Sequence, residues 1–289
     1  MEYVYLILSV FLVASTNIIG AFYNKKNNKK QDVSALYNLL LLLAVFVCWL
    51  ILFLVNKEYE LLVLPYSVGF ALCYTMCNVG IINALKTGPI MLTSLFCQLS
   101  LILVSVYGFF FWNEPFSWLI GLGMVLTIVS IFLCLYNGKN KTENKVNARW
   151  ILYILMALLG NAGCSIIQRS QQIAYQGKYA SFLMVSATFF SLIFCLIIYL
   201  RSKKIDTKDV LKTSWYYPVL AGVLNAVLNL FVILMVSSSL SASLIYPVLA
   251  VGSLIIITLF SLSVFREKLR WWQWMGVLLG VCATALLSI

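Results

Sequence analysis

The chain has 289 residues, of which 63% are apolar and 10% are charged, and its formal net charge is +11. So few charged residues cannot cover a water-soluble surface, so the composition excludes a soluble globular protein and indicates an integral membrane protein. The basic residues lie in short segments between apolar runs, which is typical of membrane-protein loops and predicts no nucleic-acid partner.

Ten apolar runs are long enough to cross a bilayer, because a helical span takes about 20 residues. The first run lacks a basic leader and a signal-cleavage motif, so we expect it to be a membrane helix. The predicted helices are 3–22, 34–55, 62–84, 88–111, 117–136, 150–171, 179–200, 214–236, 240–263 and 271–289. The predicted fold class is an all-α polytopic membrane protein, placed in the plasma (inner) membrane.

Loop charges predict the orientation. The loops after the first, third, fifth, seventh and ninth predicted helices hold 17 of the 20 lysines and arginines, and the other loops with the helix ends beside them hold 3. By the positive-inside rule, the first set faces the cytoplasm. Both termini are therefore expected on the other side of the membrane.

The second half of the chain repeats features of the first. Glu114 and Trp118 superpose without gaps on Glu267 and Trp271, an offset of 153 residues. The match continues through small residues at Gly123 and Thr127, with counterparts Gly276 and Gly280. Each glutamate follows a helix end, where a carboxylate favours the N-terminus of the next helix by about 0.3–1 kcal/mol. A gating salt bridge is the alternative role for Glu114 and Glu267.

A second offset, of 151 residues, places Tyr74 on Asn225 and Asn78 on Asn229. Two units of five helices follow from the two matches. Because five is an odd number, the second unit is inverted in the membrane relative to the first. Inverted repeats are an architecture of secondary transporters, which bind substrate between the halves. The predicted units are 1–138 and 150–289, joined by a linker at 139–149.

These features carry a resemblance to a known family. A glutamate, a tryptophan and a glycine followed by a small residue recur at 114–127 and 267–280, and SLSASLIYPVLAV precedes the second copy. This pattern resembles the ten-helix EamA branch of the drug/metabolite transporter superfamily. The resemblance implies alternating access around a central cavity and transport of metabolites such as amino acids, purines, choline or sugar phosphates. We expect no cofactor. Relatives commonly keep both termini in the cytoplasm, so either this chain is inserted the other way up or one span is miscounted.

All nine acidic residues lie in loops or at span ends. The small multidrug exporters of the same superfamily use a glutamate in their first helix. The matching segment here, SVFLVASTNIIG, offers only Ser15, Thr16 and Asn17 as polar residues between its ends. Because an intramembrane charge is the usual device for proton coupling, facilitated diffusion or exchange is expected instead of proton antiport.

Polar side chains within the spans are the candidate substrate-binding residues. Tyr74 and Asn78 are four residues apart and share one helix face, and so do Asn225 and Asn229. The candidates are Asn17, Tyr74, Asn78, Gln98, Asn161, Asn225, Asn229 and Tyr246. The alternative role for each is an interhelical hydrogen bond, worth about 0.6 kcal/mol. We expect a secondary transporter of a small polar metabolite of amino-acid, nucleobase or choline type.

Two other functions stay open. Trp49, Tyr74, Tyr107 and Tyr246 lie deep enough in their spans to build an aromatic cage, so an exporter of drug-like or quaternary ammonium cations is one alternative. A non-transporting membrane scaffold is the other. An enzyme is not expected, because the spans hold neither histidine nor aspartate to act with a nucleophile.

The remaining expectations concern metals and partners. The eight cysteines lie within apolar runs and the chain has no histidine, which predicts neither disulfides nor a metal site. Gly276 and Gly280 are spaced as a G-x-x-x-G pair, which we interpret as close packing within a monomer, with a homodimer as the alternative. The expected partners are a small-molecule substrate and the lipid bilayer.

Overall fold

The structure is a computed structural model that describes residues 2–27, 33–112, 118–135, 148–202, 207–236, 242–265 and 270–286. Every secondary-structure element within these ranges is a helix, as the sequence predicts. The α-helices are α1 (Glu2–Lys26), α2 (Val33–Asn56), α3 (Leu64–Thr87), α4 (Ile90–Gln98), α5 (Ser100–Phe111), α6 (Trp118–Leu135), α7 (Ala148–Ala174), α8 (Ala180–Arg201), α9 (Thr207–Ser214), α10 (Tyr216–Val236), α11 (Ala242–Phe260) and α12 (Trp271–Leu286). A 3-10 turn at Leu61–Val63 leads into α3, and a π-helical turn at Ser261–Phe265 follows α11.

Six of the described helices are long and apolar enough to cross a bilayer: α1, α2, α3 with its leading turn, α7, α8 and α10. Large apolar side chains point outward from the middle of these helices. Leu43, Leu72 and Leu159 are 46%, 54% and 52% exposed. A band of outward leucines is unfavourable in water and favourable in lipid, where a helix satisfies its own backbone hydrogen bonds.

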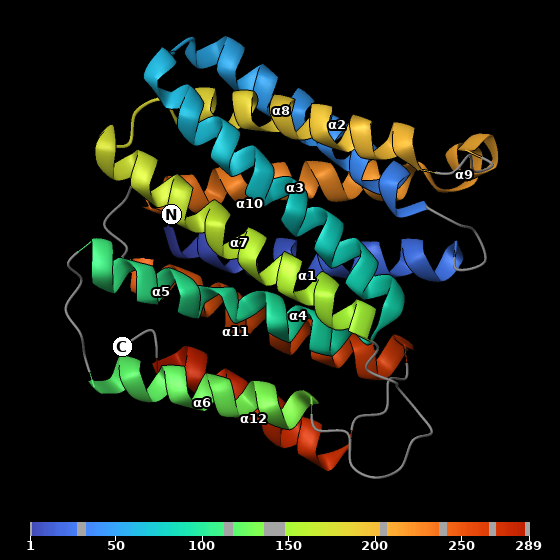
Figure 1. The fold of residues 1–289 in the computed structure, drawn as a ribbon, viewed down its shortest axis with the longest axis vertical. Coiled ribbons are helices and arrows are strands. Elements are labelled where there is room, and N and C mark those ends of the chain that lie inside the picture. The colour runs from blue at the N-terminus through green and yellow to red at the C-terminus, as the bar shows by residue number, and fades with distance from the viewer. Residues whose placement is uncertain are drawn as a thin grey trace.

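The long helices lie side by side and alternate in direction along the chain (Figure 1). The most extensive contacts join α3 to α7, α6 to α12, α1 to α10 and α2 to α8. On the left of Figure 1, α1 begins and α12 ends. On the right, α3 and α8 end and α7 begins, so the two ends of the bundle carry different sets of helix termini.

Two glycines allow α3 and α7 to touch at the backbone. A Cβ atom on Gly160 would lie 2.6 Å from the backbone oxygen of Cys73 and from the backbone nitrogen of Cys77. A Cβ atom on Gly80 would lie 2.6 Å from the backbone nitrogen of Ala157. Small residues are favoured at such crossings because they let membrane helices approach closely. This contact holds the polar faces of α3 and α7 around the same space.

The predicted helix 88–111 is wrong in one respect, because it consists of two helices that meet at Leu99. The Leu99 N–H donates to the carbonyl oxygens of Leu95 and Phe96, at 3.1 and 3.2 Å. Such shared bonding tightens the last turn of a helix. The segment from Ile90 to Phe111 has no proline, and its one glycine, Gly108, lies far from the break. Nothing in its pattern therefore predicts the break.

The short helix α9 also goes beyond the sequence analysis. It places Asp209 in its first turn and Lys212 in its last turn, which suits the helix dipole. Val210 and Ser214 are buried against the bundle. The segment is too short and too polar to be a span, and a search for apolar runs passes over it.

Several predictions fall outside the described residues. Glu114 and Glu267 lie there, as do residues 136–147, which include most of the predicted linker. The side chains of Gln98 and Tyr246 are also outside the described part of the chain, although the backbone at both positions is helical.

Candidate functional site

A cavity of about 200 Å³ is lined mainly by residues from the middle parts of α1, α3, α7 and α10, and is called the central cavity below. Six of the eight candidate residues line it: Asn17, Tyr74, Asn78, Asn161, Asn225 and Asn229. The other two, Gln98 and Tyr246, are those whose side chains are not described. Four helices that are distant in the sequence thus direct amide and hydroxyl groups at one space.

A hydrogen-bonded chain connects α3 with α10 at this cavity. The hydroxyl of Tyr74 donates to Oδ1 of Asn225 at 2.6 Å. The same oxygen accepts a bond of 2.9 Å from Nδ2 of Asn229. Asn225 therefore joins the two helices and orients Asn229, one turn further along α10.

Three cavity asparagines also bond to their own helices. Nδ2 of Asn17, Asn78 and Asn229 donates to the carbonyl oxygen four residues earlier, at 3.0, 2.9 and 2.8 Å. An amide group has two donor hydrogens and one acceptor oxygen. The bond to the helix fixes the orientation of each amide and leaves further hydrogen-bonding capacity on the side of the cavity.

Asn161 bonds to the break between α4 and α5. Its Nδ2 donates to Oγ of Ser100 at 2.7 Å and to the carbonyl oxygen of Cys97 at 3.3 Å. The carbonyl groups in the last turn of a helix have no intrahelical donor. Asn161 supplies one to α4 and thereby fastens the break to α7, which explains how two short helices keep a defined junction within the bundle.

Further polar side chains line the central cavity that were not among the candidates: Thr16, Ser165 and Gln168. Ser165 and Gln168 follow Asn161 by four and seven residues, so the helical period places all three on one face of α7. That spacing could have identified them from the sequence. Gln168 is 8% exposed, and its Nε2 has no hydrogen-bond partner in the described structure.

The central cavity is polar without charge. None of the described residues that line it is Asp, Glu, Lys or Arg. The described part of the chain also has no cluster of histidine, cysteine or acidic residues that could hold a metal ion. A neutral lining of amides and hydroxyls can replace the hydration of a small polar solute, because each group can donate or accept a hydrogen bond.

Of the four aromatic residues that the alternative function would use for a cage, the three with described side chains do not meet at one cavity. Tyr74 lines the central cavity, and Phe70 next to it has its ring centroid 5.5 Å from that of Tyr74. Trp49 is 2% exposed within the hydrophobic core instead. Tyr107 stacks on Phe111 at 4.4 Å between ring centroids and is not part of the cavity lining.

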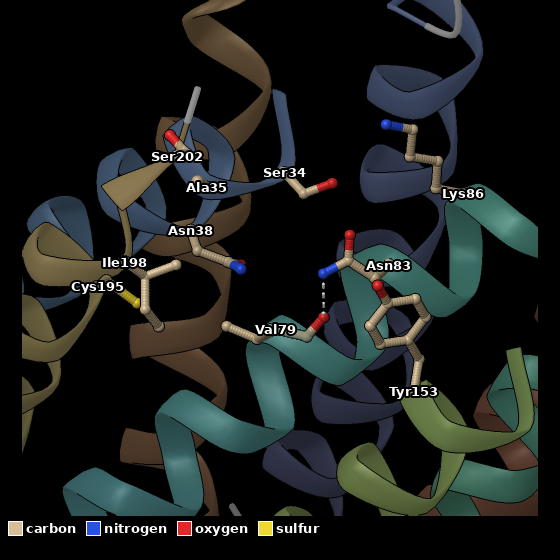
Figure 2. A pocket seen from close by; sticks show the side chains of 10 residues that line it. All are labelled: Ser34, Ala35, Asn38, Val79, Asn83, Lys86, Tyr153, Cys195, Ile198 and Ser202. Carbon is tan, nitrogen blue, oxygen red and sulfur yellow. Dashed lines mark hydrogen bonds between the residues drawn. The ribbon is translucent and has the colours of Figure 1, made fainter. Parts of the chain in front are cut away.

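Two further cavities lead from the central cavity to the end of the bundle that is on the right of Figure 1. The first, the middle cavity, has a volume of about 80 Å³ and shares Thr16, Asn17, Asn78 and Asn225 with the central cavity. The second, the outer cavity, has a volume of about 190 Å³ and shares Asn38 with the middle cavity. Figure 2 shows the outer cavity, with Lys86 on one side.

Comparison with known proteins agrees with this architecture. The family model described as the EamA-like transporter family matches residues 144–289, about half of the chain. The chain belongs to this family. It is therefore a multi-pass membrane protein of a transporter family, and the resemblance found in the sequence is confirmed. EamA proteins are typically transporters and not enzymes.

Individual relatives of this EamA transporter are distant. An uncharacterised protein of Haemophilus influenzae (strain ATCC 51907 / DSM 11121 / KW20 / Rd) is 25% identical over 193 residues, which are 64% of this chain and 62% of that protein. The chain thus spans 62% of the length of this relative. One crystal structure superposes on 97% of this chain, and the match covers 98% of the chain in that structure, with a TM-score of 0.62 at 11% sequence identity. This likeness concerns the fold alone.

Proposed function

We propose that this EamA transporter is a secondary transporter that moves a small polar metabolite across the plasma membrane by alternating access. Its substrate would be of amino-acid, nucleobase or choline type. The observation that carries the proposal is the convergence of six polar side chains from α1, α3, α7 and α10 on one uncharged cavity. Polar groups within a membrane bundle are costly unless they find partners or line a cavity, and here several keep bonding capacity at the cavity surface.

The proposal includes ten spans in two inverted units. The six long helices would supply six of these spans. The other four would be α4 together with α5, α6, α11 and α12. In the proposed repeat, the counterparts of α1, α2 and α3 are α7, α8 and α10. Helix contacts support it, because α3 packs on α7 and α8, and its counterpart α10 packs on their counterparts α1 and α2. Exchanging each helix with its counterpart leaves these pairings unchanged. In Figure 1, α1 and α7 run in opposite directions, as inversion requires.

The size of the central cavity favours a metabolite over a bulky drug. Pockets for drug-sized ligands measure about 300–1,000 Å³, whereas the central cavity measures about 200 Å³. The lining also favours uncoupled transport or exchange, because none of the described lining residues is a carboxylate that could exchange a proton.

Thermal unfolding of the purified full-length protein tests the proposal, because a bound ligand stabilises the folded state by mass action. The panel contains neutral amino acids, nucleosides, choline-like cations and guanidinium compounds. A compound that raises the melting temperature is then followed as radiolabelled uptake into proteoliposomes. We expect stabilisation by a small metabolite, and its loss in the double variant Asn78→Leu, Asn229→Leu.

Other outcomes point to the alternatives. Stabilisation only by quaternary cations would favour an exporter that uses Tyr74 and Phe70 as aromatic contacts. Uptake that persists in the double variant, at normal expression, would refute the role of the two asparagines. If no compound in the panel is taken up, and cells that produce the double variant grow like cells that produce the parent protein, a non-transporting scaffold becomes the better explanation.

A further inference from the structure

We propose that the outer cavity is a second binding site, which captures the carboxylate group of an α-amino acid or of another small monocarboxylic acid on its way to or from the central cavity. The inference rests on the proposed transport function and restricts the small polar metabolite to one that carries a single carboxylate. The outer cavity is formed by the start of α2, the ends of α3 and α8, and the first part of α7.

The lining of the outer cavity is built for a polar ligand. Ser34 and Asn38 come from α2, Asn83 and Lys86 from α3, and Tyr153 and Ser202 from α7 and the end of α8. In Figure 2, the Asn38 amide and the Ser34 hydroxyl point into the space between α2 and α3, and Lys86 lies across from Ser34. These groups belong to four helices, so their convergence results from the packing of the bundle and not from one helix surface.

Two of these groups are buried without a partner. Asn38 is 2% exposed and Ser34 is 6% exposed. Within the described structure, Oδ1 of Asn38 and Oγ of Ser34 have no hydrogen-bond partner. A buried polar atom without a hydrogen-bond partner destabilises the folded state, and most buried polar atoms in folded proteins have a partner. Atoms of this kind that point into a cavity indicate that water or a ligand completes their bonding.

The charge of the site selects the ligand. Lys86 provides the positive charge, and none of the described residues that line the outer cavity is acidic. One ammonium group with neighbouring hydroxyl and amide donors suits a single carboxylate, since hydrogen bonds to an ionised acceptor are the strong ones. A phosphate dianion would call for more cations than this lining offers, and a quaternary cation would be repelled by Lys86.

The position of the outer cavity places this step on the transport path. Asn38 belongs to both the outer and the middle cavity, and the middle cavity shares Asn17, Asn78 and Asn225 with the central one. The three cavities therefore form a track of neighbouring spaces, and each of them presents some polar side chains between Lys86 and the central asparagines. The middle cavity, at about 80 Å³, is much smaller than the other two and forms the narrow part of the track.

A paired ligand panel tests the carboxylate site. The melting temperature of the purified protein is measured against L-leucine, L-phenylalanine, L-threonine, L-serine and L-lactate, each beside its primary amide. We expect at least one acid to stabilise the protein at about one tenth of the concentration that its amide needs. Lys86→Gln should make acid and amide equal, whereas Lys86→Arg should keep the preference. Asp32→Asn, which changes an acid next to α2 in the sequence, should leave the preference in place.

The panel also distinguishes this inference from the proposed function. If no acid in the panel is more effective than its amide, if none of the acids stabilises the protein, or if Lys86→Gln keeps the preference, the carboxylate site is refuted. A neutral compound whose effect is lost in Asn78→Leu, Asn229→Leu would still support transport. Failure of both would appear as no stabilisation by any compound in either panel.

A labelling experiment tests the charge of the outer cavity without any substrate. Ser34→Cys is treated with an anionic sulfonate and with a cationic trimethylammonium methanethiosulfonate, and the rates are corrected for the parent chain. We expect the ratio of the anionic rate to the cationic rate to fall several-fold when Lys86→Gln is added. A thiol at position 34 that does not react, or a ratio that stays the same, would contradict an aqueous site governed by Lys86.

Discussion

Tyr74 on α3 donates a hydrogen bond of 2.6 Å to Asn225 on α10, and the two residues are 151 positions apart in the chain. The same separation relates Asn78 to Asn229, which also line the central cavity. Residues that match in the proposed repeat therefore meet in space. Contact between matching positions is expected near a pseudo-two-fold axis, so the axis of the proposed repeat would pass through the cavity.

Tyr74→Phe should weaken this link. It removes the hydroxyl and leaves the aromatic ring in place, and Oδ1 of Asn225 keeps its bond from Asn229. A hydrogen bond between membrane helices is worth about 0.6 kcal/mol, so we expect the melting temperature to decrease only slightly. We expect the initial rate of uptake to be clearly lower than that of the parent protein. The matched control is Tyr3→Phe, because the Tyr3 side chain is 64% exposed. Equal uptake by the two variants would argue against a role of the Tyr74 hydroxyl.

Asn161 and Ser100 should be energetically coupled. Their bond of 2.7 Å joins α7 to the junction of α4 and α5. We expect a double-mutant cycle of Asn161→Leu and Ser100→Ala, followed by chemical unfolding in detergent, to give a coupling of about 0.6 kcal/mol and at most about 1.7 kcal/mol. Ser263→Ala serves as a control, because Ser263 is exposed and bonds only to its own helix in the described structure. Additive effects of the first two variants would show that the bond does not contribute to stability.

Much of this architecture could be predicted because the bilayer imposes strict rules. Helices 179–200 and 214–236 were predicted from apolar length alone, and the structure has α8 at Ala180–Arg201 and α10 at Tyr216–Val236. Polar residues spaced by four, such as Asn225 and Asn229, indicated which helix faces turn inward. Periodicity and apolar length are local properties, so the sequence displays them directly.

The parts that could not be predicted depend on contacts between distant segments. The break at Leu99 is joined to Asn161, a residue of another helix, through Cys97 and Ser100. The outer cavity depends on the packing of four helix ends. Asn38 lies in the predicted helix 34–55 and Lys86 lies just after the predicted helix 62–84, and only the packing of α2 against α3 brings them to one cavity.

Gly160→Ala should be strongly destabilising. Its new Cβ atom would lie 2.6 Å from backbone atoms of Cys73 and Cys77, so α3 and α7 would have to separate. Overpacking of this kind typically costs about 1–3 kcal/mol. Gly69→Ala on the same interface is the control, since its Cβ atom would meet only the flexible end of Ile167, at 3.3 Å. Melting temperatures of the two variants should differ by several degrees, and similar values would show that the helices can adjust.

Transport should not require a proton gradient. The carboxylates whose side chains are described are Glu58, Glu60 and Asp209, and none of them lines the central, middle or outer cavity. Among the described residues, the path therefore lacks the intramembrane carboxylate that is the usual device for proton coupling. We expect initial uptake into proteoliposomes to stay the same when a protonophore collapses an imposed pH gradient. Uptake that depends on the gradient would indicate a coupling group elsewhere in the chain.

Both termini should face away from the cytoplasm. Figure 1 places the start of α1 and the end of α12 on one side of the bundle, and the ends of α3 and α8, with Lys86 and Arg201, on the other. The positive-inside rule assigns the second side to the cytoplasm. A green fluorescent protein fused to the C-terminus should therefore be dark in bacteria, and alkaline phosphatase at that position should be active.

The matched control for this orientation is a set of fusions after Ser202, which follows α8 on the basic side. There, the fluorescent protein should be bright and the phosphatase inactive. Because the two fusion points lie at opposite ends of the bundle, the two reporters must give opposite signals at the two positions. A bright C-terminal fusion combined with an active phosphatase after Ser202 would invert the assignment. The outer cavity and Lys86 would then open to the outside of the cell, and the carboxylate site would belong to uptake from the medium.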